Sequence, residues 1–197
     1  MKRTKKQLAA MLRIVSREQY RNDGVAFDKS KYTDRVCMPK PAGLHPSGTR
    51  YAVTDGALTI MTTDEPEGIP LVSRFDECNE FVESFVKDGR SYLMNNPPSV
   101  EDCKNAIRDW KKNPTTKFPK IYVSAETEIG TVSSCFNARL LLDALEAMGT
   151  YTHVYIGMDK TNRWRYPCLT IYRRDGRDER CSVSDWNNLA FLLPCAP

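Results

Sequence analysis

Apolar and polar positions repeat along this chain with two different periods, which predict a mixture of helices and strands. Near the amino terminus, four apolar residues recur at the i, i+3, i+4, i+7 spacing of one helical face: Leu8, Met11, Leu12 and Val15. This stripe predicts a helix over residues 5–17 that packs on a sheet. Its cations then fall on the opposite face: Lys2, Lys6, Arg13 and Arg17.

The next stretch is rich in turns and contains a predicted hairpin. Residues 22–50 carry repeated Gly, Pro and Asn, with one short strand expected at 25–27. Two β-forming runs follow, at 50–54 and 57–61, separated by Asp55-Gly56. Because Asp-Gly suits a two-residue type I′ turn, these runs are expected to pair as a hairpin. A metal or acid role for Asp55 is the weaker alternative.

The segment 64–119 differs in character, since its pattern is helical. Residues 75–86 predict a helix with Phe81 and Phe85 on one side. A second helix is expected to begin after Ser99, a typical N-cap residue, and to end before Pro114. Four cations flank the apolar stripe of this second helix: Lys104, Arg108, Lys111 and Lys112.

From residue 120 onward, strands, a helix and further strands are predicted. Residues 121–123 and 130–132 read as extended. A leucine-rich helix is expected over 136–148, ended by Gly149, with Arg139, Asp143 and Glu146 facing outward. Three strands are predicted after it, at 153–157, 168–173 and 189–193, with a helical turn at 183–188 before the last. The fold class is therefore α+β.

Length and composition fit a soluble globular protein. A chain of 197 residues, 41% of them apolar, is long enough for one elaborated domain or at most two small ones. No apolar run approaches the ~20 residues that cross a bilayer, so we expect a cytoplasmic protein with no membrane partner. Seven cysteines without a C-x-x-C pair indicate reduced, structural thiols.

Charge is distributed unevenly along the chain. Residues 1–21 hold seven basic side chains against the single acid Glu18, whereas residues 54–83 hold eight acids against Arg74. A like-charged patch attracts polyanions, so the amino-terminal cations are candidates for contact with DNA. A solvated basic face is the open alternative.

The chain shows no catalytic motif. It lacks the glycine-rich phosphate-binding loops and the G-x-S-x-G nucleophile elbow. Its only histidines are His45 and His153, and neither lies in a cysteine cluster with zinc-ligand spacing. We therefore expect no enzyme activity, no metal and no cofactor.

Several motifs resemble the third domain of bacterial sliding clamps, the DNA polymerase III beta subunit family. Residues 136–145 (FNARLLLDAL) resemble that family's Phe-Asn-Ala helix. Residues 167–171 (PCLTI) are similar to its proline-led strand, and 191–197 (FLLPCAP) to its apolar C-terminus. Residues 50–56 (RYAVTDG) resemble its Ala-Thr-Asp-Gly hairpin. The resemblance covers residues 1–62 and 120–197, in the family's order.

The resemblance implies a clamp-like domain over residues 1–197, made of two halves that each combine a helix with antiparallel strands. Segment 64–119 is then a helical insertion. In the family, such domains join edge to edge into a ring whose helices surround DNA. This chain departs from the family in having one domain in place of three, the insertion, and acids on its second helix. These departures argue against an encircling ring.

Two functions follow as expectations. The first is a non-catalytic, clamp-like accessory factor in DNA replication or repair. It would bind double-stranded DNA without reading its sequence. The second is a protein-interaction module of a phage or mobile element that keeps the fold without encircling DNA. Polymerases or other replication proteins, and further copies of the chain, are the expected protein partners. In the family, a terminal segment helps to form a peptide cleft, and three residues match it: Leu193, Pro194 and Cys195.

Overall fold

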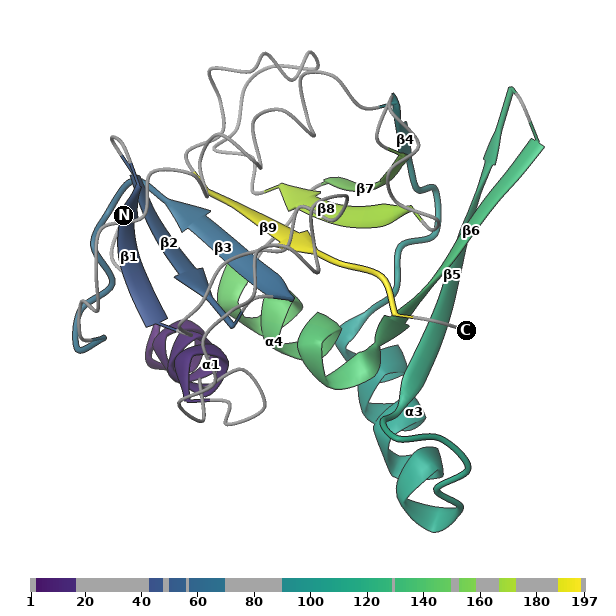
Figure 1. The fold of residues 1–197 in the computed structure, drawn as a ribbon, viewed down its shortest axis with the longest axis horizontal. Helices are drawn as coiled ribbons and strands as arrows, with labels where there is room; N and C mark the ends of the chain where they lie inside the picture. Colours follow the sequence, from purple (N-terminus) through teal and green to yellow (C-terminus); the bar gives the residue numbers. More distant parts are fainter. Residues whose placement is uncertain are drawn as a thin grey trace, which may run out of the picture.

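The described part of the chain forms three helices and nine strands (Figure 1). The computed structural model describes residues 3–16, 43–47, 50–55, 57–69, 90–128, 130–149, 153–158, 167–172 and 188–195. The α+β class predicted from the sequence is confirmed. The predicted strand at 25–27 and helix at 75–86 lie outside the described residues, as does the predicted turn at 183–188, apart from Asn188.

Among the elements described, two sets repeat the same order, a helix followed by three antiparallel strands. The first comprises α1 (Lys5–Val15), β1 (Gly43–Ser47), β2 (Arg50–Thr54) and β3 (Leu58–Thr62). The second comprises α4 (Ala138–Met148), β7 (His153–Met158), β8 (Cys168–Tyr172) and β9 (Asn188–Leu192).

The third strands of the two stretches join them into one sheet. β3 pairs antiparallel with β9, with Ile60 opposite Ala190. The resulting seven-stranded order is β1-β2-β3-β9-β8-β7-β4, so the first three strands and the next three mirror each other about the β3–β9 pair. Residues more than a hundred positions apart in the sequence therefore share one core.

The middle of the chain adds to both the sheet and the helices. β4 (Arg90–Leu93) pairs with β7 at one end of the large sheet, a strand that the sequence pattern did not predict. α3 (Val100–Lys112) packs against α4 and β5. β5 (Lys120–Thr127) and β6 (Gly130–Asn137) form a separate two-stranded ribbon that extends from the body (Figure 1). The described part of segment 64–119 is thus strand as well as helix.

The α4 helix begins two residues later than predicted. Phe136 and Asn137 belong to β6, where they pair with Ile121 and Lys120 of β5. Asn137 has extended backbone angles, and its Oδ1 accepts a hydrogen bond from the Arg139 N–H at 3.0 Å, as an N-cap does. Gly149 ends the helix as predicted, with φ 71° and an N–H bonded to the Leu145 carbonyl.

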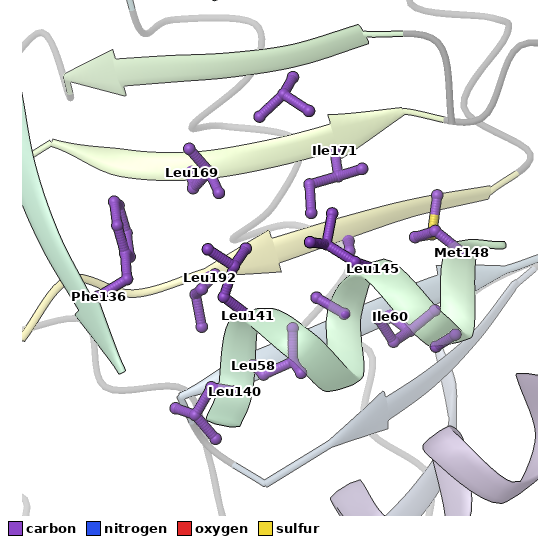
Figure 2. Close-up of a cluster of buried hydrophobic side chains, with 14 of the residues drawn as sticks. Leu58, Ile60, Phe136, Leu140, Leu141, Leu145, Met148, Leu169, Ile171 and Leu192 are labelled. Carbon is purple, nitrogen blue, oxygen red and sulfur yellow. The ribbon is translucent and has the colours of Figure 1, made fainter. Parts of the chain in front are cut away.

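The core lies between α4 and the centre of the large sheet (Figure 2). Leu141 and Leu145 point from the helix toward Leu169, Ile171 and Leu192 on the strands, and all five are at most 1% exposed. Full burial of such side chains stabilises the fold by roughly 1.5–3 kcal/mol each. The strands β3 and β9 are buried on both faces where their side chains are described, which is unusual for an antiparallel sheet.

The buried face of α1 differs from the predicted stripe. The helix buries Gln7, Ala10, Met11 and Ile14, whereas Leu12 is 42% exposed. The buried face is therefore rotated by about 100°, one residue, from the prediction. The reason is that α1 packs against α4 as well as the sheet, and Gln7 Nε2 donates to the carbonyls of Ala147 and Met148 at 3.3 Å each.

The predicted hairpin forms between β2 and β3, but with a different register. The prediction of Asp55-Gly56 as the central pair of the turn is wrong, because the ladder pairs Thr54 with Thr59. Asp55 itself donates its N–H to the Leu58 carbonyl at 3.2 Å. Its fully buried carboxylate accepts the N–H groups of Ala57 and Leu58 at 3.0 and 2.8 Å. Asp55 thus closes the turn through its side chain, as Asx turns do.

Candidate nucleic-acid interface

Two described cations of α1, Lys6 and Arg13, form ion pairs with α4. Lys6 Nζ lies 3.3 Å from Glu146 Oε1. Arg13 Nε lies 2.7 Å from Asp143 Oδ1, and a terminal nitrogen of Arg13 lies 2.5 Å from Glu146 Oε2. These pairs, with the Gln7 bonds, show that α1 and α4 pack directly against each other. The other two predicted cations of this face, Lys2 and Arg17, lie outside the described residues.

The ion pairs between α1 and α4 reduce the charge that these helices expose to solvent. Asp143 is 6% exposed, so its predicted outward orientation is wrong. Partial burial works to lower the pKa of Arg13, but the hydrogen bonds and charges of Asp143 and Glu146 outweigh it and raise the pKa overall. The positive charge of Arg13 is therefore balanced locally and is less available to a phosphate.

The four predicted cations of α3 lie on an exposed part of that helix. Arg108 donates to Asn105 Oδ1 at 2.6 Å, and Lys112 Nζ lies 3.6 Å from Asp109. Lys104 and Lys111 are exposed and form no ion pair within the described part of the chain. At 100° per residue, Lys104, Arg108 and Lys111 fall within about 60° of one another. They therefore form a basic stripe along one side of the helix.

Local contacts hold α3 in place beside α4. Ser99 and Asp102 form a capping box at the amino end, with Ser99 N–H bonded to Asp102 Oδ2 at 2.8 Å. This backbone bond, and next the Ser99 hydroxyl, lower the pKa of Asp102. At the other end Trp110 Nε1 donates to the Thr116 carbonyl at 2.8 Å, and Arg139 of α4 stacks over its ring at 5.0 Å. The basic stripe therefore sits on a fixed helix.

On its inner side, α3 carries a buried thiol. Cys103 is fully buried, and burial, with a smaller effect of the Asp102 charge, raises its pKa to about 12. The face of α3 that carries Cys103 therefore packs on the core, while the face that carries the basic stripe is exposed.

The predicted peptide-binding residues at the C-terminus form a half-buried segment that crosses between the sheet and the ribbon. Leu193 N–H donates to the Ala57 carbonyl at 2.9 Å, and Cys195 N–H to the Cys135 carbonyl at 2.8 Å. Pro194 lies between them and is also half-buried. The two thiols approach to 3.4 Å. Burial, followed by the hydrogen bond to Cys135, raises the pKa of Cys195 to about 12.

A surface hollow lies elsewhere and does not involve this segment. It has a volume of about 650 Å³ and lies between Leu93–Pro98 and strand β5. The sequence reasoning missed it. The only local signal is the run Asn95-Asn96-Pro97-Pro98, because the residue before each proline favours an extended conformation.

Two further features were sought among the residues described, a metal-ligand cluster and a membrane-spanning helix. No three His, Cys, Asp or Glu side chains in these ranges gather closely enough to hold a metal ion. None of the three helices in the described part combines the length and apolar character of a membrane span. The chain matches no protein-family model, no curated protein sequence and no solved structure.

Proposed function

We propose that this protein is a non-catalytic, DNA-associated protein with a sliding-clamp-like domain, acting in the cytoplasm as an accessory factor in replication or repair. One observation carries the proposal. Among the described elements, two stretches with the same order of one helix and three strands meet through β3 and β9, and their helices α1 and α4 pack against each other. The sequence resemblance implies a domain of two such halves, and this repeated order supports the proposal.

The arrangement gives the molecule a helical side and a strand side. α1, α4 and α3 follow one another along one side of the molecule (Figure 1), with α4 in contact with both of the others. In a clamp-like domain this helical side is the one turned toward DNA. Because a duplex carries one charge per about 1.7 Å, cations spaced along a helix can follow its phosphates without reading bases.

The strongest candidates for phosphate contact are on α3. Lys104 and Lys111 are exposed and have no ion pair in the described part, and Arg108 adds a third cation between them. Lys112 pairs only weakly with Asp109, at 3.6 Å between exposed groups. On α1, Lys6 and Arg13 already pair with carboxylates, so we assign them a smaller share of DNA binding. Lys2 and Arg17 remain part of the proposal from their sequence positions alone.

The test is a salt series of DNA binding. Fluorescence anisotropy is measured with two labelled duplexes of unrelated sequence, for the whole chain and for Lys104→Gln/Lys111→Gln. We expect equal affinity for both duplexes and a steep fall with salt. In the double variant, the slope of log K against log [salt] should become shallower by about 2, roughly 0.9 per lost phosphate contact.

A matched variant distinguishes the effect of the basic stripe on DNA binding from the effect of a lower net charge. Ser124→Glu/Ser133→Glu changes the net charge by the same amount on the exposed face of the ribbon. It should leave the salt slope unchanged. A salt-independent affinity in the parent chain, or equal effects of the two double variants, would contradict the proposed interface.

The second candidate function is a protein-interaction module of a phage or mobile element that keeps the clamp-like fold without encircling DNA. It is favoured by the ends of the large sheet. β1 contains Pro46, which has no N–H to donate, and β4 has four residues. A proline or a very short strand at the edge of a sheet hinders pairing with a strand of another domain. These two edge strands are therefore poorly suited to join domains into a ring. Molar mass in solution distinguishes the two, because a monomer cannot close a ring, whereas a stable oligomer with matched edges can.

A further inference from the structure

The hollow beside β5 is built from two extended segments. Ile121–Glu126 line one side and Leu93–Pro98 the other, and Asp102 and Asn105 of α3 complete the lining. Its volume of about 650 Å³ is at the scale of ligand-binding clefts. Nothing in the DNA-binding proposal uses this hollow, so it requires its own explanation.

The hollow faces the edge of β5 and not one of its faces. All six consecutive residues from Ile121 to Glu126 contribute to the lining, although Val123 and Ala125 are buried on one face while Tyr122 and Ser124 are exposed on the other. Residues of both faces border the same space only when the space lies along the strand's edge.

That edge is not paired in the described part of the chain. β5 pairs only with β6 there, and no backbone hydrogen bond outside this ribbon involves residues 121–126. An edge strand presents a row of N–H and C=O groups that a further strand can satisfy. Six residues of β5 extend over about 20 Å, which matches an added strand of about six residues.

The lining provides side-chain contacts as well as the backbone row. Leu93 is 46% exposed and Tyr122 is 67% exposed, two of the three large hydrophobic side chains exposed in the described part. Asn95 and Asn96 are exposed on the opposite wall, and their amides form no side-chain hydrogen bond within that part. An occupant with alternating side chains would meet apolar surface and free amide groups.

The charges of the lining select the occupant. Asp102 and Glu126 are its only ionisable acids or bases apart from the Tyr122 hydroxyl, and both are acidic. Asp102 uses Oδ2 for both bonds from Ser99, which leaves Oδ1 directed to neither. Glu126 is held by the Thr131 hydroxyl at 2.9 and 3.0 Å. A phosphate backbone is repelled by such a lining, whereas Lys or Arg is attracted.

We propose that this hollow receives an extended peptide segment of a partner protein, which adds to β5 as a further strand and carries a basic residue at each end. Main-chain bonds to the open edge supply affinity, and the Leu93 and Tyr122 side chains take apolar residues that alternate along the peptide. Asp102 and Glu126 fix its basic residues. The site borders the basic stripe of α3 at Asn105, which accepts a hydrogen bond from Arg108, but peptide binding there does not depend on DNA binding.

The probe is a seven-residue peptide with acetylated and amidated ends, Lys-Val-Thr-Val-Thr-Val-Lys. It is titrated into the isotope-labelled whole chain, and backbone amide shifts are followed by NMR. We expect shift changes at residues 121–126 and 93–98. The same peptide with glutamate at both ends should bind about five-fold more weakly. A version N-methylated at alternate residues should lose binding, because it cannot pair with the edge.

The ribbon offers a matched pair of protein variants. Ser124 and Ser133 face each other on the same rung and are both exposed, but only Ser124 lines the hollow. Ser124→Lys should weaken binding of the lysine-ended peptide at least five-fold, while Ser133→Lys should not. Equal effects of the two substitutions, or shift changes confined to other residues, would overturn the proposal.

Two further outcomes also count against it. If the β5 amide shifts depend on protein concentration without peptide, a second copy of the chain occupies the edge instead. If the glutamate-ended peptide binds as tightly as the lysine-ended one, or neither binds at millimolar concentration, the hollow does not select a basic strand.

Discussion

A Cβ atom placed on Gly149 would lie 2.6 Å from Nε2 of Gln7. This amide also donates to the carbonyls of Ala147 and Met148, the last residues of α4. At its other end, Gln7 Oε1 accepts the Thr4 N–H at 2.9 Å. One buried side chain thus completes the capping box of α1 and satisfies the carboxyl end of α4. The contact between the two halves depends on the absence of a side chain at residue 149.

Gly149→Ala should therefore destabilise the protein by about 3 kcal/mol. The positive φ of 71° costs an alanine about 1–2 kcal/mol, and displacement of Gln7 adds overpacking or lost hydrogen bonds. Gly68→Ala is the control, because Gly68 has a φ of 78° but nothing within 4 Å of the added atom. Urea unfolding should show only the backbone cost for Gly68→Ala. Equal losses at the two positions would mean that Gln7 moves freely.

The ion pairs of Arg13 lead to a prediction about stability. Arg13→Ala should lower the free energy of unfolding by about 1–2 kcal/mol, since Asp143 is left buried without this partner. The loss stays below the roughly 3–5 kcal/mol of a fully buried pair because the Arg13 side chain is 47% exposed. Lys6→Ala, at a side chain 63% exposed, should cost less than about 1 kcal/mol.

The Arg13→Ala variant also distinguishes a structural role of Arg13 from a role in DNA binding. If Arg13 serves mainly to join α1 to α4, Arg13→Ala should change the salt slope of DNA binding by less than one phosphate contact, about 0.9. A stable Arg13→Ala protein with a much shallower slope would show that the predicted DNA contact of this residue outweighs its ion pairs.

Local signals along the sequence predicted most of the elements. Ser99 followed by Asp102, and Gly149 after a leucine-rich run, mark helix ends through bonds made within a few residues. The strands that alternate or contain continuous apolar runs, such as Cys168–Tyr172, were also predicted nearly to the residue. Such features depend on neighbours in the chain, which the sequence displays directly.

What could not be predicted depends on contacts between distant residues. The buried face of α1 is decided by Gln7 meeting residues 147 and 148, about 140 positions away. The pairing of Arg13 with Asp143 turns two groups that were both expected outward into one interhelical contact. The hollow beside β5 requires Leu93–Pro98 and β5 to lie side by side, which no local pattern encodes. Periodicity predicts a face, but packing partners decide which face is buried.

Asp102 predicts a pH-dependent contribution of the α3 cap. Its pKa lies below the ordinary value of 3.8 because the Ser99 N–H, and next the Ser99 hydroxyl, bind the charged form. A depressed pKa in the folded state adds stability that is complete above the unfolded value and is lost as pH falls through the folded value. The difference in unfolding free energy between the parent and Asp102→Asn should therefore be constant at neutral pH and shrink below pH 3.8.

The control for that cap is Glu101→Gln. It removes the same charge from the same helical turn without touching the Ser99 bonds. Both variants lose the favourable interaction of a carboxylate with the helix dipole. Any larger loss of unfolding free energy in Asp102→Asn than in Glu101→Gln at neutral pH is therefore the contribution of the capping box. Identical unfolding curves for the two variants would show that the box contributes no more than its charge.

The thiols of Cys135 and Cys195 predict a specific oxidation. Their sulfur atoms lie 3.4 Å apart, close enough for a disulfide to form with small movements. With an azo oxidant such as diamide, each thiol gives up one hydrogen, the S–S bond forms, and the N=N bond is reduced to a hydrazine. Because burial raises the pKa of Cys195 to about 12 and both thiols are at least partly buried, the reaction should be slow at neutral pH and faster as the pH rises.

The bridge would fix the C-terminal segment to β6 and close a chain loop of sixty residues. It should therefore raise the free energy of unfolding by about 4 kcal/mol on the chain-entropy estimate, less any strain. Peptide mapping should find the Cys135–Cys195 bond, and Cys195→Ser should abolish both the bond and the stabilisation. Cys103, fully buried with a pKa of about 12, serves as the internal reference and should stay reduced in the folded protein. Rapid bridging at neutral pH, or modification of Cys103 before Cys195, would show that the C-terminal segment does not hold Cys195 against the ribbon as described.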